Sequence, residues 1–366
     1  MSKPAVALAR TQFAPEIAEP ATPAAAFRDF SQPWLDLNDK SVLVTGGTGS
    51  FGKHFLKTVI ERYKPRRIII YSRDELKQSD MQLDFPMTQY PFIRYFIGDV
   101  RDRDRLDLAL RDVDYVVHAA ALKQVPAAEY NPFECIRTNV FGAENLVYAA
   151  LRRNVKKVIA LSTDKAANPV NLYGASKLAS DKIFVAANNL AGHDGTKFSV
   201  VRYGNVFGSR GSVVPFFRKL VADGADHLPI TDPRMTRFWI TLTQGVNFVL
   251  SSMEMMRGGE IYVPKIASTT VTDLATLISP KLKQKIVGIR PGEKLHETMI
   301  PADDSHWTVD MQDRFVILAS FATQAREAYL ARGAVPVPEG FSYSSDTNPE
   351  ALDLRGLQQL LTMSYA

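Results

Sequence analysis

The chain has 366 residues, of which 46% are hydrophobic and 23% are charged, a composition typical of a globular protein with a sizeable core. Its mild net charge of +5 comes from scattered basic residues, which argues against a nucleic-acid-binding protein and suits a site for a phosphate-bearing small molecule. The sequence lacks an apolar run long enough for a membrane span, its apolar start is too short for a secretory signal, and its one cysteine, Cys135, excludes an internal disulfide, so we expect a cytoplasmic protein.

The first 38 residues are rich in alanine and proline and lack a sustained hydrophobic period. They predict a flexible N-terminal arm over 1–38, with a short docking segment near 27–37. From residue 40 the pattern changes to short β-branched runs that alternate with longer stretches of helical spacing, which is typical of a parallel sheet covered on both faces. Strands are expected at 41–45, 67–71, 93–97, 115–118, 157–162 and 198–203, and helices at 51–62, 103–110, 132–153 and 172–190.

The alternation ends after about residue 204, where a turn-rich loop is followed by mixed short elements. We therefore predict an α/β doubly wound parallel sheet, a Rossmann domain, over 39–204. A smaller lobe over 205–305 is expected to bind substrate, with some return to the core, because ligands of open α/β sheets lie beyond the carboxyl ends of the strands. Residues 306–366 form a C-terminal extension to which we assign no catalytic role.

A glycine-rich turn follows the first predicted strand, with Gly46, Gly49 and Gly52 at three-residue intervals. Glycine permits a tight turn and lets backbone N–H groups approach a pyrophosphate at a helix N-terminus. At the head of an alternating strand–helix pattern, this turn predicts a dinucleotide site. The other turn residues expected to contact the cofactor are Thr48, Ser50 and Phe51.

The residues after the second predicted strand favour NADP over NAD. An NAD site usually has a carboxylate at this strand tip, whereas Ser72 and Arg73, with Lys77 nearby, suit a 2′-phosphate. Asp74 leaves a ribose contact open as an alternative. Asp99, after the third strand, is expected to bind adenine, to cap the following helix, or both. Further expected cofactor contacts are Glu75, Val100, Ala119, Ala120 and Lys123.

Tyr173 and Lys177 lie four residues apart, so on a helix they share one face. A lysine ammonium beside a phenol is expected to lower the pKa of the phenol, so that Tyr173 can act as a base near neutral pH. Asp164 and Lys165 follow the fifth predicted strand. A charged pair at this place is either an acid–base pair or a strand-end ion pair.

These motifs, in this order, resemble the extended branch of the short-chain dehydrogenase/reductase family, and within it the inverting UDP-N-acetylglucosamine 4,6-dehydratases. The resemblance covers about residues 40–301. It is carried by the glycine turn, by the Tyr-x-x-x-Lys motif and by the segment 162–169, where lysine at 165 replaces the glutamate of most sugar-nucleotide 4,6-dehydratases. Other matching segments lie at 71–77, 121–126, 202–206, 235–239 and 289–297.

The resemblance implies a reaction in which a hydride is borrowed and returned. Tyr173, assisted by Lys177, removes the C4 hydroxyl proton while NADP takes the hydride, and Thr163 holds the C4 oxygen. A neutral Lys165, whose pKa is depressed by desolvation and by Lys177, takes the C5 proton, and Asp164 protonates the departing C6 hydroxyl. Return of the hydride to C6 and of a proton to the opposite face of C5 inverts that centre. The implied product is UDP-2-acetamido-2,6-dideoxy-beta-L-arabino-hex-4-ulose, the first intermediate of pseudaminic acid synthesis for flagellin or surface glycans.

The resemblance also implies a substrate side that holds the nucleoside diphosphate. Asn205 and Arg290 are expected there, since an arginine fork suits a phosphate dianion, and Lys123 is placed to touch cofactor or substrate phosphate. Residues expected to border the nicotinamide are Val206, Gly208, Ser209 and Arg210. Further substrate contacts are expected from Val213, Val214, Thr231 and Glu293. The family also implies a homo-oligomer, with a hexamer as one form.

Three other functions stay open, and a metal site is not expected. A UDP-sugar 4-epimerase would share the fold and the Tyr–Lys pair but needs no acid–base pair for dehydration. A retaining 4,6-dehydratase would leave C5 in its starting configuration, and a catalytically silent dinucleotide sensor needs neither Tyr173 nor Lys177. The six histidines lack the spacing of metal ligands, and His118 is most simply a packing residue at a strand end.

Overall fold

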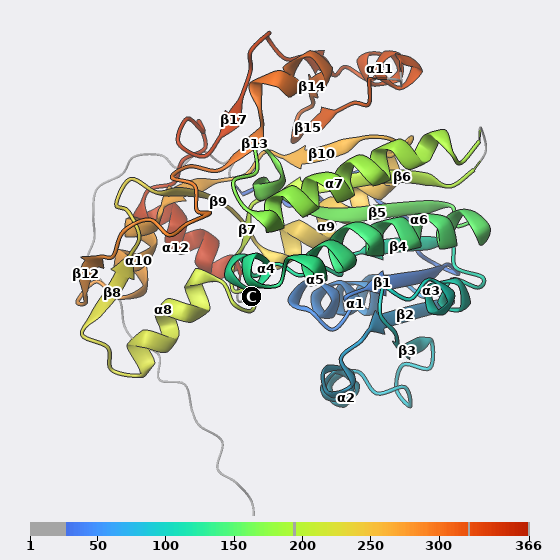
Figure 1. Cartoon of the computed structure of the whole chain (residues 1–366), viewed down its shortest axis with the longest axis horizontal. Coiled ribbons are helices and arrows are strands. Elements are labelled where there is room, and N and C mark those ends of the chain that lie inside the picture. The colour runs from blue at the N-terminus through green and yellow to red at the C-terminus, as the bar shows by residue number, and fades with distance from the viewer. Residues whose placement is uncertain (1–26, 193–194, 321–322, 365–366) are drawn as a thin grey trace, which may run out of the picture.

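The computed structural model describes residues 27–192, 195–320 and 323–364, and its centre is a parallel sheet between helices (Figure 1). All six predicted strands are present, which confirms the α/β doubly wound fold. Their bounds are β1 (Ser41–Thr45), β2 (Arg67–Ser72), β3 (Ile93–Ile97), β4 (Tyr115–His118), β5 (Lys157–Thr163) and β6 (Lys197–Tyr203). They pair in parallel in the order β3-β2-β1-β4-β5-β6.

Helices cover both faces of this sheet, which is why its strands are continuous apolar runs. Their bounds are α1 (Ser50–Arg62), α2 (Glu75–Asp84), α3 (Arg103–Ala109), α4 (Val125–Tyr130), α5 (Pro132–Ile136), α6 (Gly142–Arg152), α7 (Leu172–Ala186) and α9 (Leu242–Met255). α6 packs against α3 and α7 on one face, and α1 packs against α9 on the other (Figure 1). A π-helical turn, Arg137–Phe141, interrupts the helix expected over 132–153. Within the described ranges, no helix combines the length and the apolar character needed to cross a membrane.

The sheet continues through segments that return from later in the chain. β10 (Ile261–Pro264) pairs in parallel with β6, and β15 (Arg314–Ile317) pairs antiparallel with β10. β14 (Thr308–Asp310) and β16 (Val335–Pro336) complete a ten-stranded sheet. The residues after 306 therefore contribute to the main sheet. This contribution was not predicted, because their short strands leave no hydrophobic period in the sequence. The same region holds α11 (Thr323–Leu330) and a pair formed by β13 (Thr298–Ile300) and β17 (Tyr343–Ser344).

The segment after β6 builds a smaller lobe, at the left of Figure 1. Its strands are β7 (Asn205–Val206), β8 (His227–Ile230), β9 (Thr236–Ile240), β11 (Ser268–Thr270) and β12 (Lys283–Ile286). Its helices are α8 (Val213–Ala222), α10 (Val271–Ile278) and α12 (Leu354–Met363). Phe207, Trp239, Leu274 and Leu357 pack together in its core, so the last helix of the chain completes the lobe.

The described end of the N-terminal arm, residues 27–38, packs on the core. The rings of Phe30 and Phe248 meet edge to face with centroids 5.3 Å apart. Leu35 is buried, and Arg28 forms an ion pair with Glu350 at 2.7 Å. The short docking segment expected near 27–37 is therefore confirmed, and residues 1–26 lie outside the described chain. The domain boundaries at 38, 204 and 305 stay predictions.

Gly52 and Gly245 offer a matched test of the glycine turn, because both lie inside helices. A Cβ at Gly52 would lie 2.2 Å from the carbonyl oxygen of Gly47, whereas a Cβ at Gly245 would meet no described neighbour within 4 Å. We expect Gly52→Ala to destabilise the protein by about 1–3 kcal/mol, because the backbone of the turn must shift. Gly245→Ala should stabilise it by up to about 1 kcal/mol through higher helix propensity. Thermal unfolding measures both, and equal midpoints for the two variants would contradict the account.

Candidate active site

The carboxyl ends of the parallel strands meet at the point where the strand order reverses. The chain runs outward from β1 to β3 and then places β4 on the other side of β1. Ligands of open α/β sheets bind at such a point. A cavity of about 690 Å³ opens here, a volume typical of ligand sites. Its wall comes from the tips of β1, β2, β4, β5 and β6, from α7 and from the loop that follows β7.

The glycine turn forms one end of the cavity, and its geometry fits a dinucleotide. Gly46 has a φ of 63°, and a Cβ there would lie 2.8 Å from the backbone nitrogen of Ala120, so a side chain would not fit between the β1 and β4 tips. In the described chain, no side chain caps the N-terminus of α1, and its first turn has no acidic residue. The first N–H groups of α1 are therefore available to an anion. The wall residues of this turn are Gly46, Thr48, Gly49, Ser50 and Phe51.

The tip of β2 places hydroxyl and cationic groups on the adjoining wall. The hydroxyls of Thr48 and Ser72 share a hydrogen bond of 2.9 Å, and the guanidinium of Arg73 is exposed. Asp74 Oδ1 accepts a hydrogen bond from the backbone N–H of Lys77 at 3.0 Å, and Asp74 Oδ2 forms an ion pair with the ammonium of Lys77. Asp74 therefore caps α2, and both of its oxygens are engaged. The contact of Asp74 with the ribose, which the sequence left open, stays a prediction.

Asp99 lies on the wall near the tip of β3, but it does not cap the following helix in the described structure. Its carboxylate accepts a hydrogen bond from Arg101 Nη2 at 2.7 Å. The cap of α3 is Asp102, whose side chain accepts from the backbone N–H of Arg105 at 2.9 Å. The alternative of Asp99 as a helix cap is therefore wrong, and its contact with adenine stays a prediction. Val100, Ala119 and Ala120 line the same wall.

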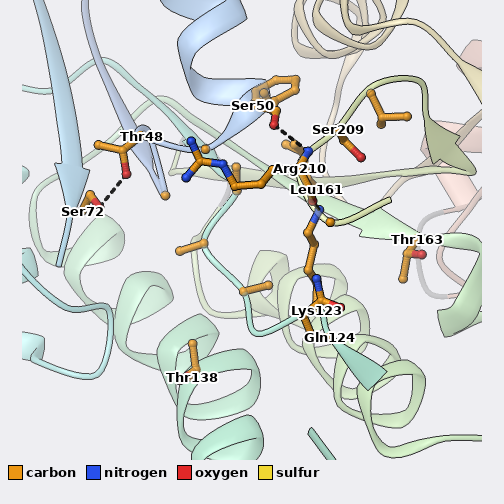
Figure 2. Close-up of a pocket in the computed structure, with 18 of the residues that line it drawn as sticks. Thr48, Ser50, Ser72, Lys123, Gln124, Thr138, Leu161, Thr163, Ser209 and Arg210 are labelled. Atoms are coloured by element: carbon orange, nitrogen blue, oxygen red, sulfur yellow. Dashed lines mark hydrogen bonds between the residues drawn. The ribbon is translucent and has the colours of Figure 1, made fainter. Parts of the chain in front are cut away.

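The loop after β7 crosses the cavity and joins its two walls (Figure 2). The backbone N–H of Arg210 donates to Ser50 Oγ at 3.2 Å, and Lys123 Nζ donates to the carbonyl oxygen of Arg210 at 3.0 Å. Figure 2 shows the guanidinium of Arg210 directed toward Thr48 and Ser72. The sequence placed Arg210 beside the nicotinamide, but its side chain lies at the β2 end of the cavity, because the loop is pinned to Ser50.

Tyr173 and Lys177 both line the cavity from α7, as their spacing predicts. The helix begins just before them, where Asn171 accepts a hydrogen bond from the backbone N–H of Gly174 at 2.7 Å. Burial raises the pKa of Tyr173 to about 12, against the lowering effect of Lys165. The prediction that Lys177 leaves this phenol with a depressed pKa is therefore wrong for the protein alone, because burial outweighs the lowering effects, which come from Lys165 and from the hydrogen bond with Thr163. Burial also lowers the pKa of Lys177, although Asp181 opposes this shift.

Lys165 forms an ion pair with two buried carboxylates. Its Nζ lies 3.0 Å from Asp164 Oδ1 and 3.0 Å from Glu297 Oε1. Burial alone would lower the pKa of Lys165, but the carboxylates of Asp164 and Glu297 raise it well above its usual value. The sequence predicted a depressed pKa for this lysine. That prediction is wrong because the attraction of Asp164 and of Glu297 outweighs desolvation, and the second carboxylate was not part of it.

Asp164 stands behind the cavity wall rather than on it. In the described structure its side chain has no exposed surface. Thr163 Oγ1 donates to Asp164 Oδ1 at 2.9 Å, and Lys165 Nζ donates to the same oxygen at 3.0 Å. Thr163 and Lys165 do line the cavity. Asp164 is therefore connected to the cavity by the hydrogen bonds that Thr163 and Lys165 donate to it.

The expected substrate residues are divided between the cavity and the lobe. Asn205, Val206 and Ser209 line the cavity. Val214 is fully buried in the core of the lobe, so the prediction that it faces the nucleotide is wrong. A turn of the lobe adjoins α7, because the carbonyl oxygen of Gly292 accepts a hydrogen bond from Asn171 at 2.7 Å. Across the described ranges, the other expected residues off the cavity wall, whose contacts stay predictions, are Gly52, Glu75, Gly208, Val213, Thr231, Arg290 and Glu293.

Several wall residues were not predicted from the sequence. Most lie next to predicted ones, at the tips of strands, and a wider window at each tip would have found them. Gln124, just before α4, lies in the matching segment 121–126 but was not expected as a contact, and Thr138, in the π-helical turn, lies in no motif. The wall residues missed at or near strand tips are Tyr71, Gly98, Leu161, Ser162, Tyr203 and Gly204. Gly211 and Ser212 come from the loop before α8, and Leu242 comes from the start of α9.

Comparison with known proteins finds similarity over most of the chain. The family model described as "Polysaccharide biosynthesis protein" matches residues 42–319. A UDP-N-acetylglucosamine 4,6-dehydratase (inverting) from Campylobacter jejuni is 60% identical over 318 residues, which cover 86% of this chain and 94% of that protein. A UDP-glucose 4-epimerase from Rickettsia canadensis is 40% identical over 335 residues, which cover 89% and 97%. The structure of dTDP-glucose 4,6-dehydratase DesIV from Streptomyces venezuelae, solved with NAD bound, matches with a TM-score of 0.60 and 26% identity over 70% of this chain and 86% of that chain.

His118 gives a pH-dependent test of the packing behind the cavity. Its ring is buried at the end of β4 and shares a hydrogen bond of 2.8 Å with Thr45 Oγ1, and burial together with Lys177 lowers its pKa from 6.5 to about 3. The unfolded chain binds a proton here below about pH 6.5 and the folded chain does not, so stability is lost as the pH falls toward the folded pKa. We expect this group to contribute a slope of about 1.4 kcal/mol per pH unit to the free energy of unfolding in that window.

Denaturant unfolding of His118→Gln across acid pH checks this slope. The variant should lose that part of the pH dependence, because glutamine does not titrate. His306→Gln changes an exposed histidine and should keep the slope of the parent protein. A His118→Gln slope equal to that of the parent would contradict the account.

Proposed function

The chain belongs to the polysaccharide biosynthesis protein family, and from that membership we propose that it is a UDP-N-acetylglucosamine 4,6-dehydratase that inverts C5. The observation that carries the proposal is the Asp164–Lys165 pair beside Tyr173, in a cavity whose other end is a dinucleotide turn. Loss of water across C5 and C6 needs an acid and a base in addition to the group that oxidises C4. The pair lies where such an acid and base are needed.

The cofactor is a nicotinamide dinucleotide, and we propose that it is NADP. Three features support the phosphorylated form: the hydroxyl of Ser72, the exposed guanidinium of Arg73 and the engaged carboxylate of Asp74. Arg210 reaches the same end of the cavity from the lobe side (Figure 2). The guanidinium groups of Arg73 and Arg210 suit a 2′-phosphate dianion.

Tyr173 is proposed as the base for the C4 hydroxyl, with Thr163 holding the C4 oxygen. Bound NADP⁺ would supply the hydride chemistry at C4 and C6, and its oxidised ring would carry a positive charge. That charge, added to the charge of Lys165, would oppose the burial that raises the pKa of Tyr173. Once C4 is a ketone, the hydrogen on C5 becomes acidic and can be removed by a base.

The Asp164–Lys165 ion pair can become the acid and the base of the dehydration in one step. A proton moves along the 3.0 Å hydrogen bond from Lys165 Nζ to Asp164: an N–H bond breaks, an O–H bond forms and both charges disappear. The neutral amine then takes the C5 proton, and the protonated carboxyl supplies the proton for the C6 hydroxyl, which leaves as water. Thr163 lies between Asp164 and the cavity and donates to the same carboxylate, so it links the acid to the substrate.

Proton return to the opposite face of C5 gives the inverted product, UDP-2-acetamido-2,6-dideoxy-beta-L-arabino-hex-4-ulose. We propose that this is the first step of pseudaminic acid synthesis for flagellin or surface glycans, carried out by a cytoplasmic homo-oligomer. Asn205 on the cavity wall is proposed to bind the substrate diphosphate, and Arg290 on the adjoining lobe is proposed to assist it. Lys123, Thr231 and Glu293 are proposed to complete the nucleotide contacts.

A UDP-sugar 4-epimerase is the second candidate, because the Rickettsia canadensis relative carries that name. An epimerase needs only the Tyr–Lys pair and a rotating 4-ketone. Two carboxylates around a lysine at the cavity wall have no role in that reaction, and they favour dehydration. A retaining dehydratase would use the same pair without inverting C5, and a silent dinucleotide sensor would not need Tyr173 or Lys177.

Product analysis tests the proposed function. The protein, incubated with NADP⁺ and UDP-N-acetylglucosamine, should yield a 4-keto-6-deoxy sugar, and proton NMR couplings of the fresh product should show an inverted C5. Formation of the C4 epimer would replace the proposal by the epimerase, and a product with the starting C5 configuration would replace it by the retaining dehydratase. Lys165→Ala should lose dehydration while it still binds NADP, and normal turnover by this variant would refute its role as base.

Arg73→Ala tests the choice of cofactor. Loss of a charge-assisted contact with the 2′-phosphate should weaken NADP binding about 10- to 100-fold. Binding of NAD should hardly change, because NAD lacks that phosphate. Arg103→Ala, at the start of α3 and off the cavity wall of the described chain, serves as a matched control. Calorimetric titration measures both affinities, and an equal loss for NAD and NADP would contradict the assignment.

A further inference from the structure

One buried carboxylate beside the cavity, Glu297, has no role in the mechanism above. Its side chain is almost fully buried, and its Oε1 lies 3.0 Å from Lys165 Nζ and 3.7 Å from Arg237 Nε. Its Oε2 is buried and has no hydrogen-bond partner within the described chain. Burying a carboxylate with one oxygen unpaired is unfavourable. This cost indicates that the negative charge at this place serves another purpose.

The backbone around Glu297 holds this carboxylate in place. The N–H of Glu297 donates to Ser345 Oγ at 2.9 Å, and its carbonyl oxygen accepts from the N–H of Ser345 at 2.8 Å. Arg237 is fixed in turn, because its Nη1 donates to the carbonyl oxygen of Leu295 at 3.1 Å and its Nη2 to that of Lys294 at 3.0 Å. The carboxylate therefore meets Lys165 from an element far from Asp164 in the sequence.

We propose that Glu297 is a positioning residue for Lys165, which holds the lysine as an ammonium at the cavity wall and sets the pH range in which its neutral amine becomes available. The inference rests on the proposed function, in which Lys165 is the base for C5. It gives a role to the buried carboxylate of Glu297, which closes the matching segment 289–297 but was not expected at the site from the sequence.

The charges around Lys165 explain how Glu297 would act. Proton transfer from Lys165 to Asp164 removes both charges of that pair, but Glu297 lies just as close to the ammonium and stabilises it against this transfer. Replacing the carboxylate by an amide of the same shape should therefore favour the neutral amine. The titratable or charged groups that face Lys165 are Asp164 in its own turn, Tyr173 on α7, Arg237 on β9, and Lys294 and Glu297 in the segment before β13.

Exchange of the C5 hydrogen with solvent measures proton removal by Lys165 separately from the redox chemistry at the cofactor. The 4-keto-6-deoxy sugar that keeps the C5 configuration of the substrate, and so presents its C5 hydrogen to the face of Lys165, is incubated with the NADP-loaded enzyme in deuterated buffer, and proton NMR follows loss of the C5 signal across neutral and alkaline pH. This exchange needs a base at C5 but no transfer of hydrogen to the cofactor. We expect Glu297→Gln to shift the rise of the exchange rate to lower pH by about one to three units, because an opposite charge has been removed from the lysine.

The pH at which the exchange rate rises, rather than the maximum rate, tests whether Glu297 controls the charge state of Lys165. The maximum rate can fall as well, since the amine loses one of its two anchors, but loss of rate alone also follows from a purely structural role. A Glu297→Gln profile with the same pH dependence as the parent would overturn the proposal. Should Glu297→Gln fail to fold, Glu297→Asp keeps the charge one methylene further away and should give a smaller shift in the same direction, and an unshifted profile would again overturn it.

Two further variants and the parent protein complete the experiment. Glu350→Gln removes another buried, ion-paired glutamate, the partner of Arg28, and should leave the profile unchanged. Lys165→Ala should abolish exchange, since the base is gone. If the parent protein makes no 4-keto-6-deoxy product at all, the proposed function fails, whereas exchange by the parent with an unshifted Glu297→Gln profile sinks only the role of Glu297.

Discussion

A lysine held between two buried carboxylates, Asp164 and Glu297, is the interaction on which the proposed chemistry depends. Within this ion pair, one proton can move between the amine of Lys165 and the carboxylate of Asp164. The resting form of the pair is charged, because each carboxylate stabilises the ammonium, and its reactive form is the neutral amine beside a protonated carboxyl. The site can therefore provide an acid and a base from the same two side chains, without a water molecule as intermediary.

Three distant parts of the chain assemble this ion pair. Asp164 and Lys165 follow the central strand β5, Arg237 belongs to the lobe strand β9, and Glu297 precedes β13. Glu297 is in turn fixed by Ser345, close to the end of the chain. Residues after 306, which also extend the main sheet, thus support the active site although they lie off the cavity wall in the described structure. The loop around Arg210 joins the lobe to the glycine turn in a similar way (Figure 2).

Sequence patterns predicted those features of the fold and of the site that depend on residues close together in the chain. Short β-branched runs located all six central strands, the glycine spacing located the turn between β1 and α1, and the four-residue spacing placed Tyr173 and Lys177 together on the cavity wall. The later sheet strands were missed, because strands of two to four residues are too short to leave a period in the sequence. The charge state of Lys165 was predicted wrongly for a related reason. It depends on Glu297, which is 132 positions further along the chain and reaches the lysine only through the tertiary fold.

The central claim is that the hydrogen taken from C4 is given back at C6 of the same sugar, while Lys165 and its carboxylates remove water in between. UDP-N-acetylglucosamine labelled with deuterium at C4, turned over with unlabelled NADP⁺, tests this claim most directly. The account predicts that mass spectrometry and NMR find the deuterium on C6 of the 4-keto-6-deoxy product. Deuterium retained at C4 of an epimer, or left behind in reduced cofactor, would contradict it.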